Sequence, residues 1–372
     1  LKGGFRENTE RVGQMSMGFK LNLNPLLEGL NAKVTFSFDT YNFTSIGKND
    51  DFYSYIPTAW DGDVLLKDSL VTAGRKNSDM STLGSEGYRQ YSILGQLNYN
   101  RYFGYHYITS SLVFDGDERE IMYMKYRNKT QSNTLLLKYA FKDKFITDFN
   151  IGLLGSSKIE KSKNYKLFPA VGVGWIVSKE EFMANLRPVK YLKLRTSYGI
   201  SGSDDALDFF GYQTRWSYYN NFTYFGSDAK NEVNVTKLES YYSPLLDWEK
   251  SKEFNLGLEM LVWDNFFVDL NYYHINRDNI PVLGENIFSQ IWGISNLKIN
   301  YVEIENNGFD LSLKYLKQTQ DWRINAGINL NYSLSNYLKS PSWSGMPENR
   351  NMDNKAVDSY IGLVSDGILR DT

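Results

Sequence analysis

Few side chains in this sequence have the types and spacing that catalysis or metal binding requires. The chain of 372 residues contains two His, His106 and His274, and no Cys. A His-based triad or a metal cluster needs companion residues that these two His lack. We therefore interpret both as strand-end residues, with His106 opening a predicted strand and His274 closing one. The sequence predicts no catalytic residue, no metal ligand and no cofactor.

Two acidic groups and one glycine pair carry weaker signals. The run 115–120 could supply oxygen ligands to Ca²⁺, but it lacks the spacing of an EF-hand, so a solvated loop is the preferred interpretation. Asp204 and Asp205 would suit glycoside hydrolysis only at a defined separation, which a sequence does not give. Gly172 and Gly174 lie in a predicted strand and lack the spacing of a phosphate-binding loop. We expect that the protein is not an enzyme.

Aromatic residues in three predicted loops are the best candidates for ligand binding. Flat, amphipathic rings can contact sugar faces or peptide side chains with little loss of conformational entropy. The alternative is that these rings pack the loops against one another. The candidate substrate-binding residues are Tyr53, Tyr55 and Trp60 in one loop, Tyr212, Trp216, Tyr218 and Tyr219 in a second, and Trp292 in a third.

The elements that hold these loops are predicted to be strands. From Leu30 to Phe38 and from Trp322 to Leu334, apolar residues alternate with polar ones or Gly. Because successive strand side chains point to opposite faces, each stretch has one apolar and one polar face. We count roughly a dozen such strands, most of them about ten residues long, as membrane-spanning strands are.

The connections between these strands alternate between short and long. Short ones are expected near 23–29, 101–105, 142–144, 179–190, 263–265 and 317–321, and long ones near 40–88, 116–131, 155–166, 201–247, 277–302 and from 335 to the end. Short turns on one side and long loops on the other are typical of an outer-membrane barrel. The fold class predicted is therefore all-β, a transmembrane antiparallel β-barrel in the outer membrane of a Gram-negative cell.

Charge and hydropathy exclude two other classes. Lys and Arg number 41 against 43 Asp and Glu, which gives a net charge of −2. This balance lacks the basic footprint of a nucleic-acid-binding protein. No apolar run is long enough for a transmembrane helix, whereas alternating barrel strands need no such run.

Several segments, taken in order, resemble SusC/RagA-type TonB-dependent transporters. They are 167–175 with 178–183, which could form a short helical turn, then 191–203, 246–259, 266–273, 305–311 and 362–369. The strand ending in 150–157 departs from the Arg-Asp-Gly-Ser-type sequence usual in that family. The resemblance implies a barrel of about 22 strands, plugged by an N-terminal domain.

The resemblance also implies function and partners. Such proteins import oligosaccharides or peptides through the outer membrane, driven by TonB, beneath a SusD-type surface lipoprotein. Residues 1–372 are expected to form part of one barrel domain, with long extracellular loops near 40–88, 201–247, 277–302 and 335–372. The plug, the TonB box and the final strands are expected to lie outside this chain, so that TonB would act through the missing N-terminal region.

The expected partners are the lipoprotein, TonB, a glycan or peptide cargo and outer-membrane lipid, with no nucleic acid. Polar-face residues that would face the lumen include Glu253, Glu259, Asp269, Asp310 and Arg323.

Two other interpretations of the sequence are alternatives to a TonB-driven importer. One is a passive porin or adhesin barrel, and the other is a soluble all-β carbohydrate-binding module.

Overall fold

The structure, a computed structural model, is built almost entirely of β-strands. It describes residues 5–48, 54–62, 64–72, 81–122, 127–218, 222–225, 231–284, 287, 297–342 and 345–362. Two 3₁₀ turns, Val177–Lys179 and Glu181–Met183, are the helical elements of these residues, and neither is long or apolar enough to cross a membrane. The all-β class expected from the sequence is confirmed, and the short helical turn expected near 178–183 is present.

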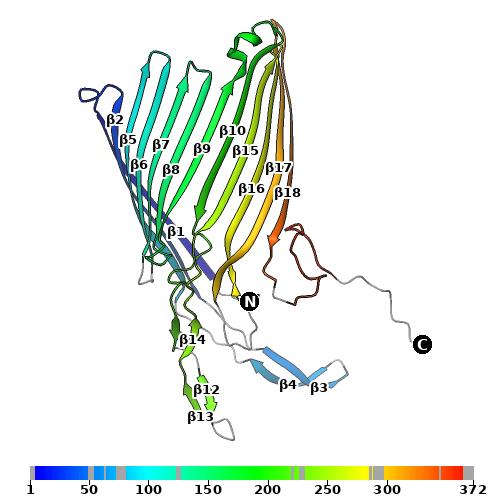
Figure 1. The fold of residues 1–372 in the computed structure, drawn as a ribbon. Helices are drawn as coiled ribbons and strands as arrows, with labels where there is room; N and C mark the ends of the chain where they lie inside the picture. The colour runs from blue at the N-terminus through cyan, green and yellow to red at the C-terminus, as the bar shows by residue number, and fades with distance from the viewer. Residues whose placement is uncertain are drawn as a thin grey trace. The chain divides into compact units, whose positions relative to one another are not determined.

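Twelve strands of the described chain form one sheet (Figure 1). In sheet order they are β1 (Phe5–Asn22), β2 (Leu30–Lys48), β5 (Ser81–Phe103), β6 (His106–Ile121), β7 (Arg127–Phe141), β8 (Phe145–Ser156), β9 (Tyr165–Ile176), β10 (Val189–Ser203), β15 (Glu249–Val262), β16 (Phe266–Leu283), β17 (Lys298–Gln318) and β18 (Arg323–Lys339). Every ladder from β7 to β18 is antiparallel. The order in the sheet follows the order in the chain, as in a meander of hairpins.

The strands run longer than the sequence predicted. They span 12 residues in β8 and 23 in β5, where about ten were expected for a membrane-spanning strand. The ladders continue past the apolar stretches, so that β2 reaches Lys48 and β16 reaches Leu283. The run 115–120, expected in a solvated loop, lies inside β6, so that prediction was wrong.

Connections of 2 to 12 residues join the strands at one end of the sheet. The connections there are 23–29, 104–105, 142–144, 177–188, 263–265 and 319–322. Two of them place successive residues at positive φ, Lys142 and Asp143 at 52° and 50°, and Trp263 and Asp264 at 50° and 60°. These angles are those of type I′ turns, whose twist matches that of antiparallel strands. The other end carries the connections 49–80, 122–126, 157–164, 204–248 and 284–297.

The register gives the sheet one apolar face and one polar face. Leu258, Leu270, Leu311 and Leu330 stand opposite one another in an unbroken row across β15 to β18. One residue along each strand, the neighbouring row is Gly257, Asn271, Asp310 and Asn331. Because the side-chain period is two, the first row lies on the opposite face from the second.

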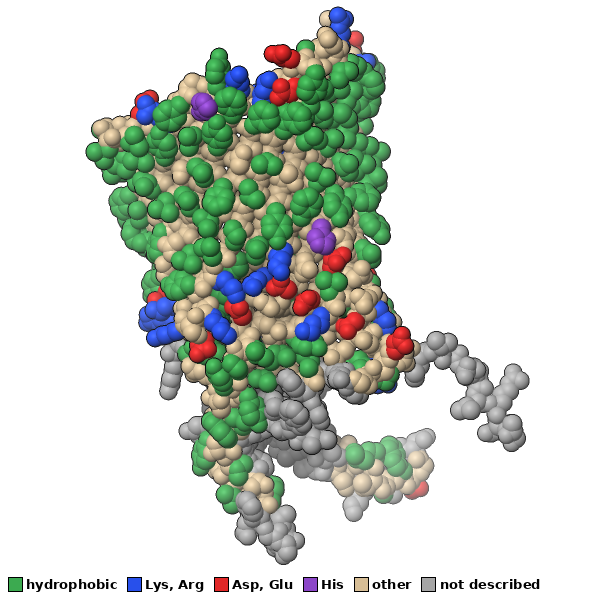
Figure 2. Space-filling model, viewed as in Figure 1, with side chains coloured by type: hydrophobic (Ala, Val, Ile, Leu, Met, Phe, Trp, Pro, Cys, Tyr) green, Lys and Arg blue, Asp and Glu red, His purple; other side chains and the backbone are tan. Residues whose placement is uncertain are grey.

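The apolar face is exposed over a broad band. Hydrophobic side chains cover the middle of the strands in Figure 2, and Lys, Arg, Asp and Glu gather toward both ends. Leu330 on this face is 54% exposed and Leu270 is 41% exposed. An apolar surface of this extent is stable in lipid, where a membrane barrel presents its apolar band, and not in water.

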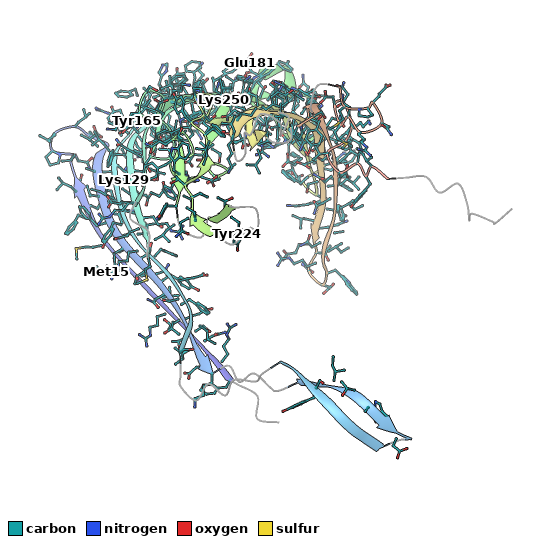
Figure 3. All side chains as sticks on the ribbon, turned by 90° about the horizontal axis from the view of Figure 1, so that it is seen from below. Met15, Lys129, Tyr165, Glu181, Tyr224 and Lys250 are labelled. Atoms are coloured by element: carbon teal, nitrogen blue, oxygen red, sulfur yellow. The ribbon has the colours of Figure 1, made fainter. Side chains whose placement is uncertain are left out.

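The chain divides into two compact units. The smaller comprises Leu1–Phe19, Val34–Leu94 and Gly116–Lys129, and the larger comprises Lys20–Lys33, Gly95–Asp115 and Thr130–Thr372. Seen along the strands, the sheet of the larger unit follows a curve (Figure 3).

A small apolar core ties the longest connection of the larger unit to its sheet. Its buried members are Ile159, Phe168, Leu207, Leu246 and Trp248, with Leu154, Ile200 and Tyr212 packed against it. The Phe168 and Trp248 rings meet edge to face with centroids 5.7 Å apart. Gly202 leaves room for the Phe168 ring, which a Cβ at that position would strike. The connection 204–248 is therefore anchored at both ends.

Candidate functional site

The aromatic connection of the larger unit forms a ribbon of two short β-ladders. β11 (Arg215–Ser217) pairs with β14 (Lys237–Ser240), and β12 (Phe222–Phe225) pairs with β13 (Asn231–Asn234) (Figure 1). Arg215 Nε donates to Ser240 Oγ at 3.2 Å, which links the first ladder through its side chains. Seen along the strands, Tyr224 projects onto the hollow side of the curved sheet (Figure 3).

The candidate residues that the sequence placed in one loop lie in different environments in the structure. Trp216 is 63% exposed and Tyr218 is 55% exposed, so both rings are accessible to a ligand. Tyr212 instead packs against the apolar core and contacts Phe210 at 6.4 Å between ring centroids. Tyr219 lies outside the described residues. Tyr224, another aromatic residue of the same predicted loop, is 52% exposed.

The other candidate aromatics belong to different segments. Tyr55 and Trp60 lie on β3 (Ser54–Asp61), which pairs with β4 (Val64–Thr72) in the smaller unit. Their side chains are 54% and 57% exposed. Tyr53 and Trp292 lie outside the residues that the structure describes.

Ion pairs occupy the polar face of the larger unit. Lys193 Nζ lies 3.0 Å from Glu259 Oε1, and Arg195 reaches the same oxygen at 3.5 Å and Asp269 Oδ1 at 3.3 Å. On the same face, Asp310 accepts a hydrogen bond from Asn331. The predicted polar-face residues Glu259, Asp269 and Asp310 therefore brace neighbouring strands.

Two further polar-face candidates lie farther along the strands. Glu253 accepts a hydrogen bond from Asn255 Nδ2 at 2.7 Å. Arg323 begins β18 opposite Gln318, close to the turn 319–322. The hydrogen bond between Glu253 and Asn255 stays within β15.

Two adjoining cavities lie along this polar face. One, of about 450 Å³, is lined by Lys138, Asp148, Gly172, Gly174, Lys193 and Arg195, among others. The second, of about 390 Å³, shares Asp148, Gly172, Ser197 and Asn255 with it and adds Glu253. Gly172 and Gly174 create part of this hollow because they have no side chain. This hollow could have been predicted from the sequence, because Ala170, Gly172 and Gly174 are small residues at alternate positions and so lie on one face of β9.

The acidic run within β6 is held by neighbouring strands. Asp117 accepts hydrogen bonds from Gln90, at 3.1 Å, and from Ser92. Glu118 pairs with Lys129, whose Nζ lies 3.0 Å from Glu118 Oε2, and with Arg127. Among the described residues, no group of three or more His, Asp or Glu could hold a metal ion.

The two His occupy different kinds of position. His106 opens β6 as expected, with Nδ1 2.7 Å from the Tyr139 hydroxyl. His274 lies inside β16, with Nδ1 2.6 Å from Asn307 Oδ1, so the prediction that it closes a strand was wrong. β16 continues because its ladder with β17 extends beyond the apolar band.

The family model that matches this chain and the curated relatives that resemble it are all of TonB-dependent receptors. The family model described as "TonB dependent receptor-like, beta-barrel" matches residues 3–362. TonB-dependent receptor P3 of Formosa agariphila is 25% identical over 329 residues, which cover 85% of this chain and 32% of that protein. TonB-dependent receptor SusC of Bacteroides thetaiotaomicron is 27% identical over 218 residues, covering 56% of this chain and 21% of that protein. These relatives are named as receptors, not as enzymes.

Solved structures share the fold. A structure of the RagAB peptide transporter matches with a TM-score of 0.69 at 18% identity, over 92% of this chain and 38% of that chain. The RagAB peptide importer in the "closed-closed" state matches with a TM-score of 0.68 at 17% identity, over the same shares. At these identities the likeness concerns the fold alone. The chain spans about a third of the length of the first of these curated relatives.

Proposed function

The chain belongs to the TonB-dependent receptor β-barrel family, and from that premise we propose that it is part of the barrel of an importer. Proteins of this family lie in the outer membrane, and the exposed apolar band of this sheet fits that location. The proposed activity of the whole protein is TonB-driven import of oligosaccharides or peptides.

The observation that carries the proposal is the separation of the two faces along the strands. The row from Leu258 to Leu330 would contact lipid, while the opposite row, with Asn271 and Asp310, would line a wet lumen. The cavities beside Asp148 and Arg195 lie on that lumenal wall. A barrel with a polar lumen offers hydrophilic cargo a route through the apolar layer.

The two ends of the sheet would have different roles. Outer-membrane barrels place short turns in the periplasm and long loops outside the cell. On that basis the connections 49–80, 204–248 and 284–297 are extracellular, and Trp216 and Tyr218 are the first rings that cargo meets. Exposed, amphipathic rings suit both sugar faces and peptide side chains.

The proposed partners are TonB and a SusD-type lipoprotein. The curated relative SusC and the RagAB importer support this assignment through their likeness to the chain. TonB would act through a region of the whole protein outside these 372 residues, and the lipoprotein would contact the long loops.

Growth of a deletion strain tests the proposal. We expect loss of growth on one class of oligosaccharide or peptide as sole carbon source, restored by the gene and abolished again when TonB is removed. Import that continues without TonB would favour a passive porin or adhesin barrel. A protein that stays monomeric without detergent would favour a soluble carbohydrate-binding module.

A further inference from the structure

The connection 177–188 is the longest one at the short-turn end of the sheet. It has 12 residues, whereas the other connections at that end have 2 to 7. Two 3₁₀ turns order it, and they bury Val177 and Met183. Two other apolar side chains stay outside this packing, since Phe182 is 64% exposed and Leu186 is 50% exposed.

The connection folds onto the lipid-facing side of the sheet. Trp175 of β9 stands in register with Leu194 of β10, which faces Leu258 in the apolar row. The Phe182 ring packs edge to face against the Trp175 ring, with centroids 6.5 Å apart. Seen along the strands, Glu181 lies on the convex, outer side of the curved sheet (Figure 3). The connection therefore continues the surface that is proposed to contact lipid.

Hydrogen bonds hold the connection in this position. Trp175 Nε1 donates to Glu180 Oε1, and Lys144 Nζ donates to Glu180 Oε2, each at 3.2 Å. Lys179 Nζ donates to the Asp143 carbonyl oxygen at 3.0 Å, which links the connection to the neighbouring turn. These bonds fix the chain just before Phe182, so that its exposed ring is presented at a defined place on the sheet.

The turn 263–265 borders the connection and has the same character. The Trp263 backbone N–H donates to the Pro188 carbonyl oxygen at 2.8 Å, and the Trp263 side chain is 62% exposed. Its ring meets that of Phe266, on the lipid-facing side of β16, edge to face at 6.0 Å. Both connections thus carry exposed apolar side chains at the end of the apolar face, the level at which aromatic residues meet lipid headgroups.

The charged side chains around the connection suit a phospholipid surface. Glu180 is paired with Lys144. The remaining charged residues of 142–144 and 177–188 are exposed and include one more cation than carboxylates: Lys142, Lys179 and Arg187 with Asp143 and Glu181. Long cationic side chains can reach lipid phosphates while neighbouring Phe and Leu side chains enter the apolar layer.

We propose that the connection 177–188 is an interfacial anchor, with Phe182 and Leu186 inserted among the lipids of the leaflet at the short-turn end. Short turns of an outer-membrane barrel face the periplasm, so this is the periplasmic leaflet. The inference goes beyond the proposed function and does not depend on import. Phospholipid is favoured over a protein partner because the exposed side chains continue the lipid-facing row without a break.

Depth-dependent quenching in lipid vesicles tests the anchor. The full-length receptor, with any thiol outside these 372 residues replaced by Ser, receives one thiol at a time through Phe182→Cys, Leu186→Cys, Leu270→Cys or Gln320→Cys. Each thiol is labelled with a nitrobenzoxadiazole dye, and the vesicles contain lipids brominated either near the headgroup or near the chain end. Leu270, in the middle of the apolar row, is the reference, and Gln320, exposed in the turn 319–322, is the control.

The expected result is a distinct depth for each class of label. Emission at positions 182 and 186 should shift to shorter wavelength and lose intensity with bromine near the headgroup. The label at position 270 should lose intensity with bromine near the chain end, and the label at position 320 should keep its intensity in both lipids.

The reference separates the anchor from the proposed function. Labels at 182 and 186 that behave as the one at 320, with the label at 270 quenched, would overturn the anchor and leave the barrel assignment intact. An unquenched label at 270 would count against both. Labels at 182 and 186 that shift to shorter wavelength without quenching by either lipid would indicate a protein partner and would also overturn the anchor.

A second variant tests whether Phe182 holds the connection in lipid. Phe182→Ser in the receptor labelled at position 186 should reduce the quenching of that label, because it removes the ring that contacts Trp175. Glu181→Gln, next to it, keeps both apolar side chains and should leave the quenching unchanged. Heat-modifiable migration in gels establishes that each variant is folded. Full quenching in folded Phe182→Ser would contradict the role of Phe182 in the anchor.

Discussion

Lys193 of β10 and Glu259 of β15 face each other in register, with Nζ 3.0 Å from Oε1. One step along the same ladder, Leu194 faces Leu258. An ion pair and an apolar pair thus stand on opposite faces of two adjacent strands. The same step between a polar row and an apolar row recurs across β15 to β18.

Arginine at two adjacent positions of β16 should have different effects. Leu270→Arg places a charge in the middle of the apolar row and should cost about 2–4 kcal/mol, as for arginine near the midplane of a barrel. Asn271→Arg places it on the polar face and should change stability by less than about 1 kcal/mol. Reversible unfolding of the full-length protein in lipid vesicles measures both values. Equal costs at the two positions would contradict the assignment of the faces.

Gly308 of β17 is expected to tolerate no side chain. It stands opposite Tyr273, whose ring lies over it, and a Cβ there would come within 2.5 Å of the Tyr332 carbonyl oxygen. Gly308→Ala should therefore destabilise the sheet by about 1–3 kcal/mol, the usual cost of overpacking.

Gly327 of β18 provides the matched control for Gly308. A Cβ at Gly327 would meet its nearest atom, the Leu313 carbonyl oxygen, at 3.5 Å, an ordinary contact. Gly327→Ala should leave the thermal unfolding midpoint within error of the wild type. A larger loss in Gly327→Ala than in Gly308→Ala would show that the ring does not occupy that position.

The strands could be predicted from sequence where one face is apolar. Alternation predicted the strand from Trp322 to Leu334, and the structure has β18 over Arg323–Lys339. The prediction failed where a ladder continues with polar residues on both faces, as at 115–120 and beyond His274. Hydrogen bonding between neighbouring backbones holds those segments extended, and a single sequence does not show that pairing.

The site was harder to predict because binding surfaces depend on tertiary contacts. Composition identified Trp216 and Tyr218 as candidate rings, but it did not distinguish them from Tyr212, which packs in the apolar core. Asp204 and Asp205 were noticed only as a pair. Their common cavity with Asp115 and Trp248 arises from strands far apart in the chain.

The turn after β9 should respond to pH through Glu180. Hydrogen bonds from Trp175 Nε1 and Lys144 Nζ, each at 3.2 Å, hold the pKa of the Glu180 carboxyl below its ordinary value. A lowered pKa means that the ionised form stabilises the turn above the unfolded-state pKa. This stabilisation is lost as the pH falls through the folded-state pKa.

Glu180→Gln should therefore lower hydrogen-exchange protection of 177–188 at neutral pH and match the wild type in acid. Glu181→Gln, next to it and exposed, should leave protection unchanged at both pH values. Protection in Glu180→Gln equal to the wild type at neutral pH would show that these hydrogen bonds do not hold the turn.

The exposed rings of the ribbon should contribute to uptake and not to assembly. Trp216→Ala with Tyr218→Ala removes two aromatic anchors, which at binding surfaces costs about tenfold or more in affinity. Uptake at low cargo concentration should fall accordingly, while the folded fraction in heat-modifiability gels stays the same. Unchanged uptake would refute this part of the ribbon as a cargo site.

One face of the sheet is expected to meet lipid and the other to meet water. The chain has no Cys, so each thiol introduced along β16 is the only one within it. Nitroxide labels placed singly at residues 266–273 in vesicles report contact with lipid-soluble oxygen or with a water-soluble nickel chelate. We predict that oxygen relaxes the labels at Phe266, Val268, Leu270 and Tyr272, and that the chelate relaxes those at Phe267, Asp269, Asn271 and Tyr273. Equal access of the chelate to both sets would contradict the membrane-barrel account.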